Sequence, residues 1–191
     1  MTEELLVAIG ENRPSTLARA TLHEIRTQKK VMGTVHIIFG PQGAGKSTYA
    51  RKLSLEIQGV RFSIDEWMHQ LFGPDQPQPI SFSWVIDRVR RCEKRIWATA
   101  LEVALAGGNV VLDLGFMKVE SRSEFQSMAD AAGLSTQLHF IDAPHAVRKE
   151  RVLTRNAERG ETFSFEVTSD MFDFMEREFQ RPTDKELCAA I

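Results

Sequence analysis

A glycine-rich segment of eight residues, Gly40-Pro41-Gln42-Gly43-Ala44-Gly45-Lys46-Ser47, constrains the fold more than any other part of this 191-residue chain. An apolar, β-branched run precedes it at residues 35–39, and a helical pattern follows at residues 46–57. Glycines let the chain turn so that successive backbone N–H groups face one anion, and the helix adds its positive N-terminal dipole. The segment therefore predicts a phosphate-binding loop (P-loop) between a buried strand and a helix.

The residues of this loop also predict its ligands. Lys46 can reach the β- and γ-phosphates of a nucleotide, and the Ser47 hydroxyl can ligate Mg²⁺. We therefore expect ATP and Mg²⁺ as cofactors, although the loop does not distinguish ATP from GTP. The predicted nucleotide contacts are Gly40, Gln42, Gly43, Ala44, Gly45, Lys46, Ser47 and Thr48. The alternative is a glycine-rich turn that binds nothing.

Strand and helix patterns alternate along the chain after residue 34. Strands are predicted at residues 35–39, 60–64, 109–113 and 136–141, and helices at 46–57, 83–106, 121–132, 145–159 and 169–179. The proline-rich residues 73–79 are predicted to form a mobile loop. Because parallel strands need crossover helices, the pattern predicts a three-layer α/β/α P-loop NTPase fold with a parallel sheet. Residues 1–33 are predicted to be an N-terminal helical extension, with a helix at 15–30, and residues 34–191 the P-loop domain.

Composition narrows the partners and the compartment. Lys and Arg number 24 against 26 Asp and Glu, and no long basic run is present, so nucleic acid is allowed as a partner but not favoured. Two cysteines are too few for a disulfide framework, which favours a reducing cytoplasm. No apolar stretch approaches the ~20 residues that span a bilayer, so no membrane association is expected. The oligomeric state is left open.

Three further segments follow the P-loop in a characteristic order. They are Ser63-Ile64-Asp65, Val110-Val111-Leu112-Asp113, and Asp142-Ala143-Pro144 with Arg151 and Arg155 after it. With the P-loop, they make residues 35–182 resemble P-loop kinase-like families that include chloramphenicol phosphotransferase, the zeta toxins and polynucleotide 5′-kinases. The resemblance implies the kinase strand order 2-3-1-4, an arginine-rich lid helix and ATP-dependent phosphoryl transfer.

Two acidic residues are candidates for the chemistry. Asp65 follows the second strand at the sheet edge where ligands collect, and the resemblance implies that it takes the proton of an attacking hydroxyl. Its alternative is an N-cap of a helix beginning near Glu66, which could itself replace Asp65 as base. Asp113 ends an apolar strand, the Walker B position that holds Mg²⁺. Its alternative is an ordinary acid in solvent.

Four arginines share one face of the helix after Pro144, because they recur at steps of three and four residues: Arg148, Arg151, Arg155 and Arg159. Guanidinium groups bind phosphate oxygens and stabilise charge that develops during transfer, so this helix is predicted to close over ATP. Arg151 and Arg155 match the family's lid arginines. For Arg148 and Arg159 the alternative is a solvated basic face balanced by Glu150 and Glu158.

Other side chains receive weaker assignments. Trp67 and Phe72 are predicted to line an acceptor pocket, whereas Trp84 and Trp97 fit a core. The histidines in strands, His36 and His139, are predicted to be satisfied by hydrogen bonds rather than to bind a ligand. Two arginines on the helix at residues 83–106, Arg88 and Arg91, suit either a charged acceptor or plain surface charge.

Together these features predict an ATP-dependent phosphotransferase that acts on a hydroxyl of a small molecule. One alternative changes the acceptor to a polynucleotide 5′ end, for which residues 66–82 offer only His69 as a cation. The other is an ATP-hydrolysing switch protein with no acceptor. Acceptor pockets are built from loops without a transferable code, so the acceptor itself is not predicted.

Overall fold

The computed structural model describes residues 31–77, 79, 81–158 and 166–189. The chain divides into residues Met1–Val31 and a compact unit, Met32–Ile191, which contains every element described below. The helix predicted at residues 15–30 and the predicted lid residue Arg159 lie outside the described residues.

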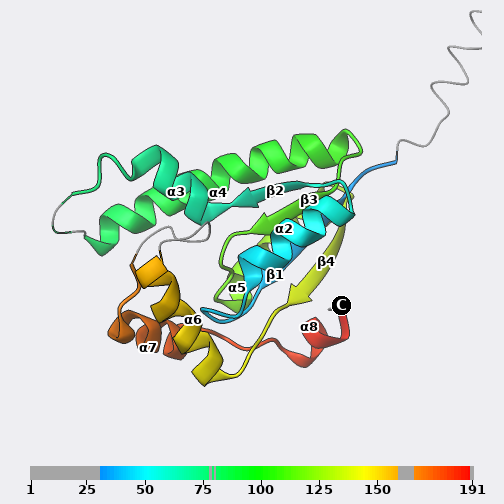
Figure 1. Cartoon of the computed structure of the whole chain (residues 1–191). Coiled ribbons are helices and arrows are strands. Elements are labelled where there is room, and N and C mark those ends of the chain that lie inside the picture. The colour runs from blue at the N-terminus through cyan, green and yellow to red at the C-terminus, as the bar shows by residue number, and fades with distance from the viewer. Residues whose placement is uncertain (1–30, 78, 80, 159–165, 190–191) are drawn as a thin grey trace, which may run out of the picture. The chain divides into compact units, whose positions relative to one another are not determined.

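A four-stranded sheet with the order β2-β3-β1-β4 forms the centre of this unit (Figure 1). Its strands are β1 (Thr34–Phe39), β2 (Val60–Ser63), β3 (Val110–Asp113) and β4 (Ser135–Phe140). All pairings are parallel; Val35 lies opposite Val110 of β3 and Thr136 of β4, and Ser63 lies opposite Asp113. The predicted parallel sheet and its 2-3-1-4 order are confirmed.

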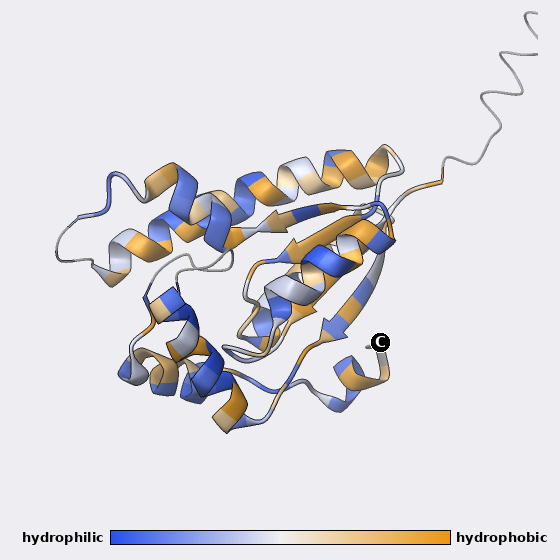
Figure 2. Ribbon diagram, in the orientation of Figure 1, coloured by the Kyte–Doolittle hydropathy of each residue, from blue (hydrophilic) through white to orange (hydrophobic). Residues whose placement is uncertain are grey.

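Side chains alternate between the two faces of the sheet and give the fold three layers. On one face, Ile37 and Phe39 of β1 join the main core with Ile96 and Phe125. These two partners come from α4 (Phe82–Leu105) and α5 (Val119–Ala131). On the other face, Ile38 packs against Ala50 and Leu53 of α2 (Lys46–Glu56). In Figure 2 the central strands are predominantly hydrophobic, as buried parallel strands are.

The remaining helices lie toward the carboxyl ends of the strands or along the chain's last segment. They are α3 (Ile64–Phe72), α6 (His145–Glu158), α7 (Ser169–Glu178) and α8 (Asp184–Ala189). Helices α6 and α7 lie side by side (Figure 1), joined by Val152, Val167 and Phe172. Helix α8 was not predicted, because a six-residue helix is too short to show a helical period.

Helix α3 begins earlier than predicted, and its cap corrects one interpretation of Asp65. Ser63 ends β2 and is the N-cap, its hydroxyl accepting a hydrogen bond from the Glu66 backbone N–H at 3.4 Å. Asp65 is therefore the second residue of the helix and not its cap. The other predicted helices differ from the observed ones by one or two residues at either end. None of the helices in the described part of the chain combines the length and apolar character needed to cross a bilayer.

Candidate active site

Two glycines of the P-loop lie so close to neighbouring backbone that no side chain would fit. A Cβ on Gly40 would lie 1.9 Å from the carbonyl oxygen of Ile141, and one on Gly43 would lie 2.4 Å from that of Arg148. Both residues also have positive φ, 153° and 77°, which glycine tolerates best. The P-loop is thus packed directly against the segment that follows β4 and against α6.

Lys46 lies over the loop, and no carboxylate of the described residues is within ion-pair distance of its ammonium group. Its ammonium group donates a hydrogen bond to the carbonyl oxygen of Pro41 at 2.9 Å. Burial lowers the pKa of Lys46, the nearby Asp113 and Asp65 raise it again, and Arg155 and Arg148 add to the lowering. The predicted phosphate-binding lysine and the two predicted acids are therefore brought into one electrostatic site.

Asp65 lies among charged groups although solvent still reaches its side chain. The surrounding protein raises the pKa of Asp65 above its ordinary value of 3.8, and Asp113 raises it further. Lys46 and Arg155 oppose this shift. A carboxyl group with a raised pKa, held at the start of a helix at the carboxyl edge of the sheet, is a better proton acceptor than an ordinary aspartate.

The two predicted lid arginines differ in exposure but both lie at this site. Arg151 is exposed, and its Nη1 lies 3.9 Å from where a Cβ of Gly45 would be. Arg155 is half-buried; burial lowers its pKa, which Asp65 partly restores. The Nε of Arg155 is one of the buried side-chain nitrogens in the described residues that have no hydrogen-bond partner. A buried donor without a partner is costly, and an anion between the P-loop and α6 would satisfy it.

Arg61 on β2 is part of the site but was not predicted. Its Nη1 donates to Asp113 at 3.0 Å and its Nη2 donates to Glu66, which also accepts from Arg51 at 2.9 Å. Burial alone would raise the pKa of Glu66, but the hydrogen bonds from Arg61 and Arg51 lower it below its ordinary range. Glu66 is therefore held as a paired carboxylate. Only an arginine inside a short apolar strand hinted at this role in the sequence.

Arg148 does not lie on a solvated basic face, which corrects one predicted alternative. Its side chain is buried, with 2 % of its area exposed, and it forms a double ion pair with Glu176 of α7 at 2.6 and 2.8 Å. It also donates to the carbonyl oxygens of Ala143 at 2.8 Å and of Gln42 at 3.2 Å. Arg148 thus joins α6 to the P-loop and to α7.

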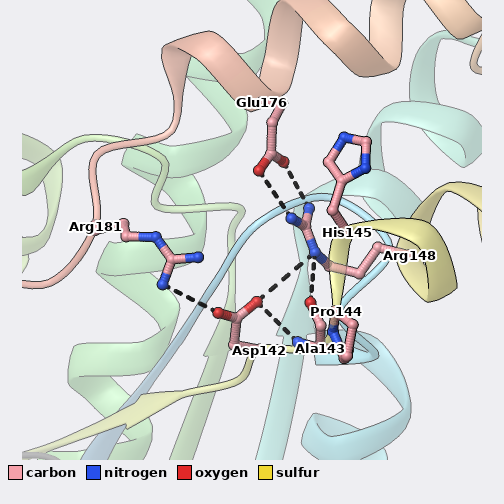
Figure 3. A pocket seen from close by; sticks show the side chains of 7 residues that line it. All are labelled: Asp142, Ala143, Pro144, His145, Arg148, Glu176 and Arg181. Atoms are coloured by element: carbon pink, nitrogen blue, oxygen red, sulfur yellow. Dashed lines mark hydrogen bonds and ion pairs between the residues drawn. The ribbon is translucent and has the colours of Figure 1, made fainter.

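An open pocket of about 430 Å³ lies beside Arg148 (Figure 3). Asp142 lines it, accepts one hydrogen bond from the Ala143 N–H at 2.8 Å and forms an ion pair with Arg181 at 3.2 Å. The lining residues are Asp142, Ala143, Pro144, His145, Arg148, Glu176 and Arg181. Because Arg148 contacts Gln42, this pocket adjoins the P-loop on the β4 side.

The residues predicted to hold Mg²⁺ offer the oxygen ligands that this ion prefers. Ser47 is half-buried in the first turn of α2, next to the exposed Thr48, and Asp113 is buried at the end of β3. Within residues 31–77, 79, 81–158 and 166–189, no cluster of three or more acidic, histidine or cysteine side chains could hold a metal by itself. This set suits an ion that is held largely by nucleotide phosphates, as Mg²⁺ is in P-loop proteins.

The aromatic side chains near α3 and α4 and the two strand histidines lie mostly in packed surroundings. Trp67, Phe72 and Trp97 are all partly buried and pack against the main core, as predicted for Trp97. The acceptor pocket expected at Trp67 and Phe72 stays a prediction. His36 and His139 are hydrogen-bonded to each other at 3.0 Å, and His139 also contacts the Tyr49 hydroxyl at 2.9 Å. Both histidines are satisfied, as predicted.

Three solved structures that resemble this chain are kinases by name. A putative kinase from Chloroflexus aurantiacus aligns over 80% of this chain and 82% of its own, with 16% identity and a TM-score of 0.63. A gluconokinase from Sinorhizobium meliloti covers 85% and 82%, with 14% identity and a TM-score of 0.56. The APS kinase of Mycobacterium tuberculosis, solved with AMPPNP and APS, covers 80% and 85%, with 22% identity and a TM-score of 0.54.

At identities this low, the structural similarity shows a shared fold alone. No curated protein matches the sequence. The family model for the AAA domain matches residues 35–182, from the start of β1 to the segment after α7. This range contains the P-loop, both acids and the lid arginines, and it coincides with the range of the kinase-like resemblance. The chain belongs to the AAA domain family and has the fold of a P-loop kinase.

Proposed function

We propose that this protein is an ATP-dependent phosphotransferase that moves the γ-phosphoryl group of ATP to a hydroxyl of a small molecule. The observation that carries the proposal is the meeting of Lys46, Asp65, Asp113 and Arg155 at one site beside the P-loop. Cations that can receive phosphate and an acid with a raised pKa are the two components of phosphoryl transfer to a hydroxyl. The kinase neighbours of similar fold, one of them solved with an ATP analogue, support it.

In this proposal the P-loop backbone and Lys46 hold the phosphates, with Thr48 beside them. Ser47 and Asp113 would hold Mg²⁺, which supplies positive charge against the phosphate oxygens. The nucleoside end extends into the pocket at Asp142 and His145, which adjoins the loop. Arg151 and Arg155 reach the γ-phosphoryl group from α6.

The chemical step uses Asp65 as base. The acceptor oxygen forms a bond to the γ-phosphorus while the bond to the β–γ bridging oxygen breaks, the hydroxyl proton passes to the Asp65 carboxylate, and ADP leaves. Arg155, whose Nε has no partner before the ligand binds, donates to charge that develops on the transferred group.

The test is ADP release by the purified protein with ATP, Mg²⁺ and a panel of hydroxyl compounds that includes sugars, nucleosides, antibiotics and a 5′-hydroxyl oligonucleotide. We expect turnover to be negligible until one small molecule is added, and Lys46→Ala to lose both ATP binding and turnover. Constant turnover that ignores every acceptor would instead indicate a switch protein. Turnover dependent on the oligonucleotide alone would indicate a polynucleotide kinase.

A further inference from the structure

Arg88 of α4 is held in an aromatic corner at the end of the helix pair α3–α4. Its guanidinium carbon lies 3.8 Å from the centroid of the Trp84 ring and 5.6 Å from that of Phe72. The two rings meet edge to face, with centroids 6.3 Å apart, so the last residue of α3 and the first turns of α4 build the corner together. Stacking on two rings fixes the plane of the guanidinium group.

The hydrogen bonds of Arg88 are incomplete. Nη1 donates to the carbonyl oxygen of Trp84 at 3.1 Å, whereas the Nε is buried without a partner. Among the described residues, no carboxylate lies within ion-pair distance of this guanidinium group. A guanidinium has five N–H donors, so this cation is oriented by its neighbours yet retains free donors for an oxyanion.

Arg91, a second arginine of α4, differs from Arg88 in its surroundings. The two arginines lie three residues apart on the same helix, and the sequence alone does not distinguish them. Arg91 is exposed, whereas Arg88 is half-buried against the two rings. Surface charge therefore describes Arg91 but not Arg88.

Asp65 and this corner belong to the same helix pair. Asp65 is the second residue of α3 and Phe72 is its last, so the helix rise separates them by about 10 Å. A compound whose hydroxyl lies at Asp65 and whose other end lies near Phe72 has the length of a phosphorylated sugar or a nucleotide. Resting on the proposed phosphotransferase function, we propose that Arg88 binds an anionic group, a phosphate or a carboxylate, on the acceptor substrate.

The test measures binding of matched compounds to protein saturated with AMPPNP and Mg²⁺, so that the P-loop is filled and does not bind them. The pairs are ribose with ribose 5-phosphate, adenosine with AMP, and glucose with gluconate. We expect an anionic member to bind, Arg88→Gln to weaken that binding about tenfold to a hundredfold, and Arg91→Gln, the same charge change on the same helix, to alter it less than about twofold. A phosphate or a carboxylate acceptor is distinguished by which pair responds.

The NMR signal of the Arg88 Nε–H group gives a second measurement that does not require turnover. Assigned by its loss in Arg88→Lys, which keeps the charge and lets the fold be checked by thermal melting, it should shift saturably with the anionic compound only. Neutral compounds binding as tightly as anionic ones, equal effects of Arg88→Gln and Arg91→Gln, or no binding of any anionic compound would overturn the proposal. Failure of AMPPNP to bind would instead overturn the proposed function. In that case the Arg88 signal can be titrated with inorganic phosphate in the free protein, and the absence of a shift would count against the anion site.

Discussion

Two regions of the molecule use arginines in opposite ways. Arg148 and Arg122 are buried arginines that we call the supports. Arg148 is paired with Glu176. Arg122 is fully buried and donates to Glu186 at 2.5 and 3.1 Å and to two backbone carbonyls. At the two proposed ligand sites, Arg155 and Arg88 are half-buried and each keeps a buried Nε without a partner. The arginines of the first region are more deeply buried than these two, and the regions also differ in whether the hydrogen bonds are complete. Complete bonding indicates support, and incomplete bonding indicates a place for a ligand.

The largest effect is expected from Asp65→Asn, which keeps the size of the site residue but removes its ability to take a proton. Transfer should fall by a factor of about 10²–10⁴, with ATP affinity and melting temperature near those of the wild type. Steady-state kinetics and calorimetry measure both. Glu66→Gln is the matched control, because Glu66 is occupied by Arg61 and Arg51; loss of transfer in this variant, with normal transfer in Asp65→Asn, would make Glu66 the base.

Arg148→Gln should act on stability. Removing one partner of a buried ion pair leaves Glu176 without its cation, which typically costs about 3–5 kcal/mol of unfolding free energy. Lys149→Gln, a neighbour that pairs with Asp173 on a more exposed surface, should cost under about 1 kcal/mol. Urea denaturation of both variants measures the difference. Equal losses of unfolding free energy in the two variants would mean that Arg148 contributes no more to stability than a more exposed ion pair does.

Arg155→Gln should lower turnover and leave stability intact. Loss of a donor to developing charge lowers turnover by a factor of about 10²–10³, whereas the melting temperature should stay or rise, because a buried unpaired donor is removed. Kinetics with ATP varied separate this from a loss of nucleotide affinity. An Arg155 variant that is active but less stable would place Arg155 among the supports.

The smallest effect concerns the histidine pair beneath α2, which is satisfied only while neutral. Burial, with a contribution from His139, lowers the pKa of His36 from 6.5 to about 4. Between these values the unfolded chain binds a proton that the folded chain does not, so stability should fall by about 3 kcal/mol from pH 6.5 to 4 and be flat above 6.5. His36→Gln should flatten this fall in urea denaturation. An unchanged profile would assign the pH dependence to other groups.

The difference between the two regions also limits what the sequence could predict. The P-loop and the parallel sheet followed from local patterns, whereas the strand order was implied by the resemblance to P-loop kinases. The positions of Lys46 and Asp65 beside each other followed from topology. The arginine ion pairs did not, because Arg148 and Glu176 are 28 residues apart and, within the site, Arg61 and Asp113 are 52 apart. Periodicity places an arginine on a helix face, but it does not reveal which acid packs opposite. The stacking of Arg88 on Trp84 likewise depends on how α3 and α4 meet.

The fate of the γ-phosphoryl group distinguishes a phosphotransferase from an ATP-hydrolysing switch. ATP labelled with ¹⁸O in that group is incubated with the protein, Mg²⁺ and the compound that stimulates turnover, and the products are identified by mass spectrometry. We predict that the label appears on the compound as a phosphate ester in the wild type and that Asp65→Asn abolishes this product. Label that appears only in inorganic phosphate, with the compound unmodified, would rule out phosphoryl transfer to this compound and indicate an ATP-hydrolysing switch.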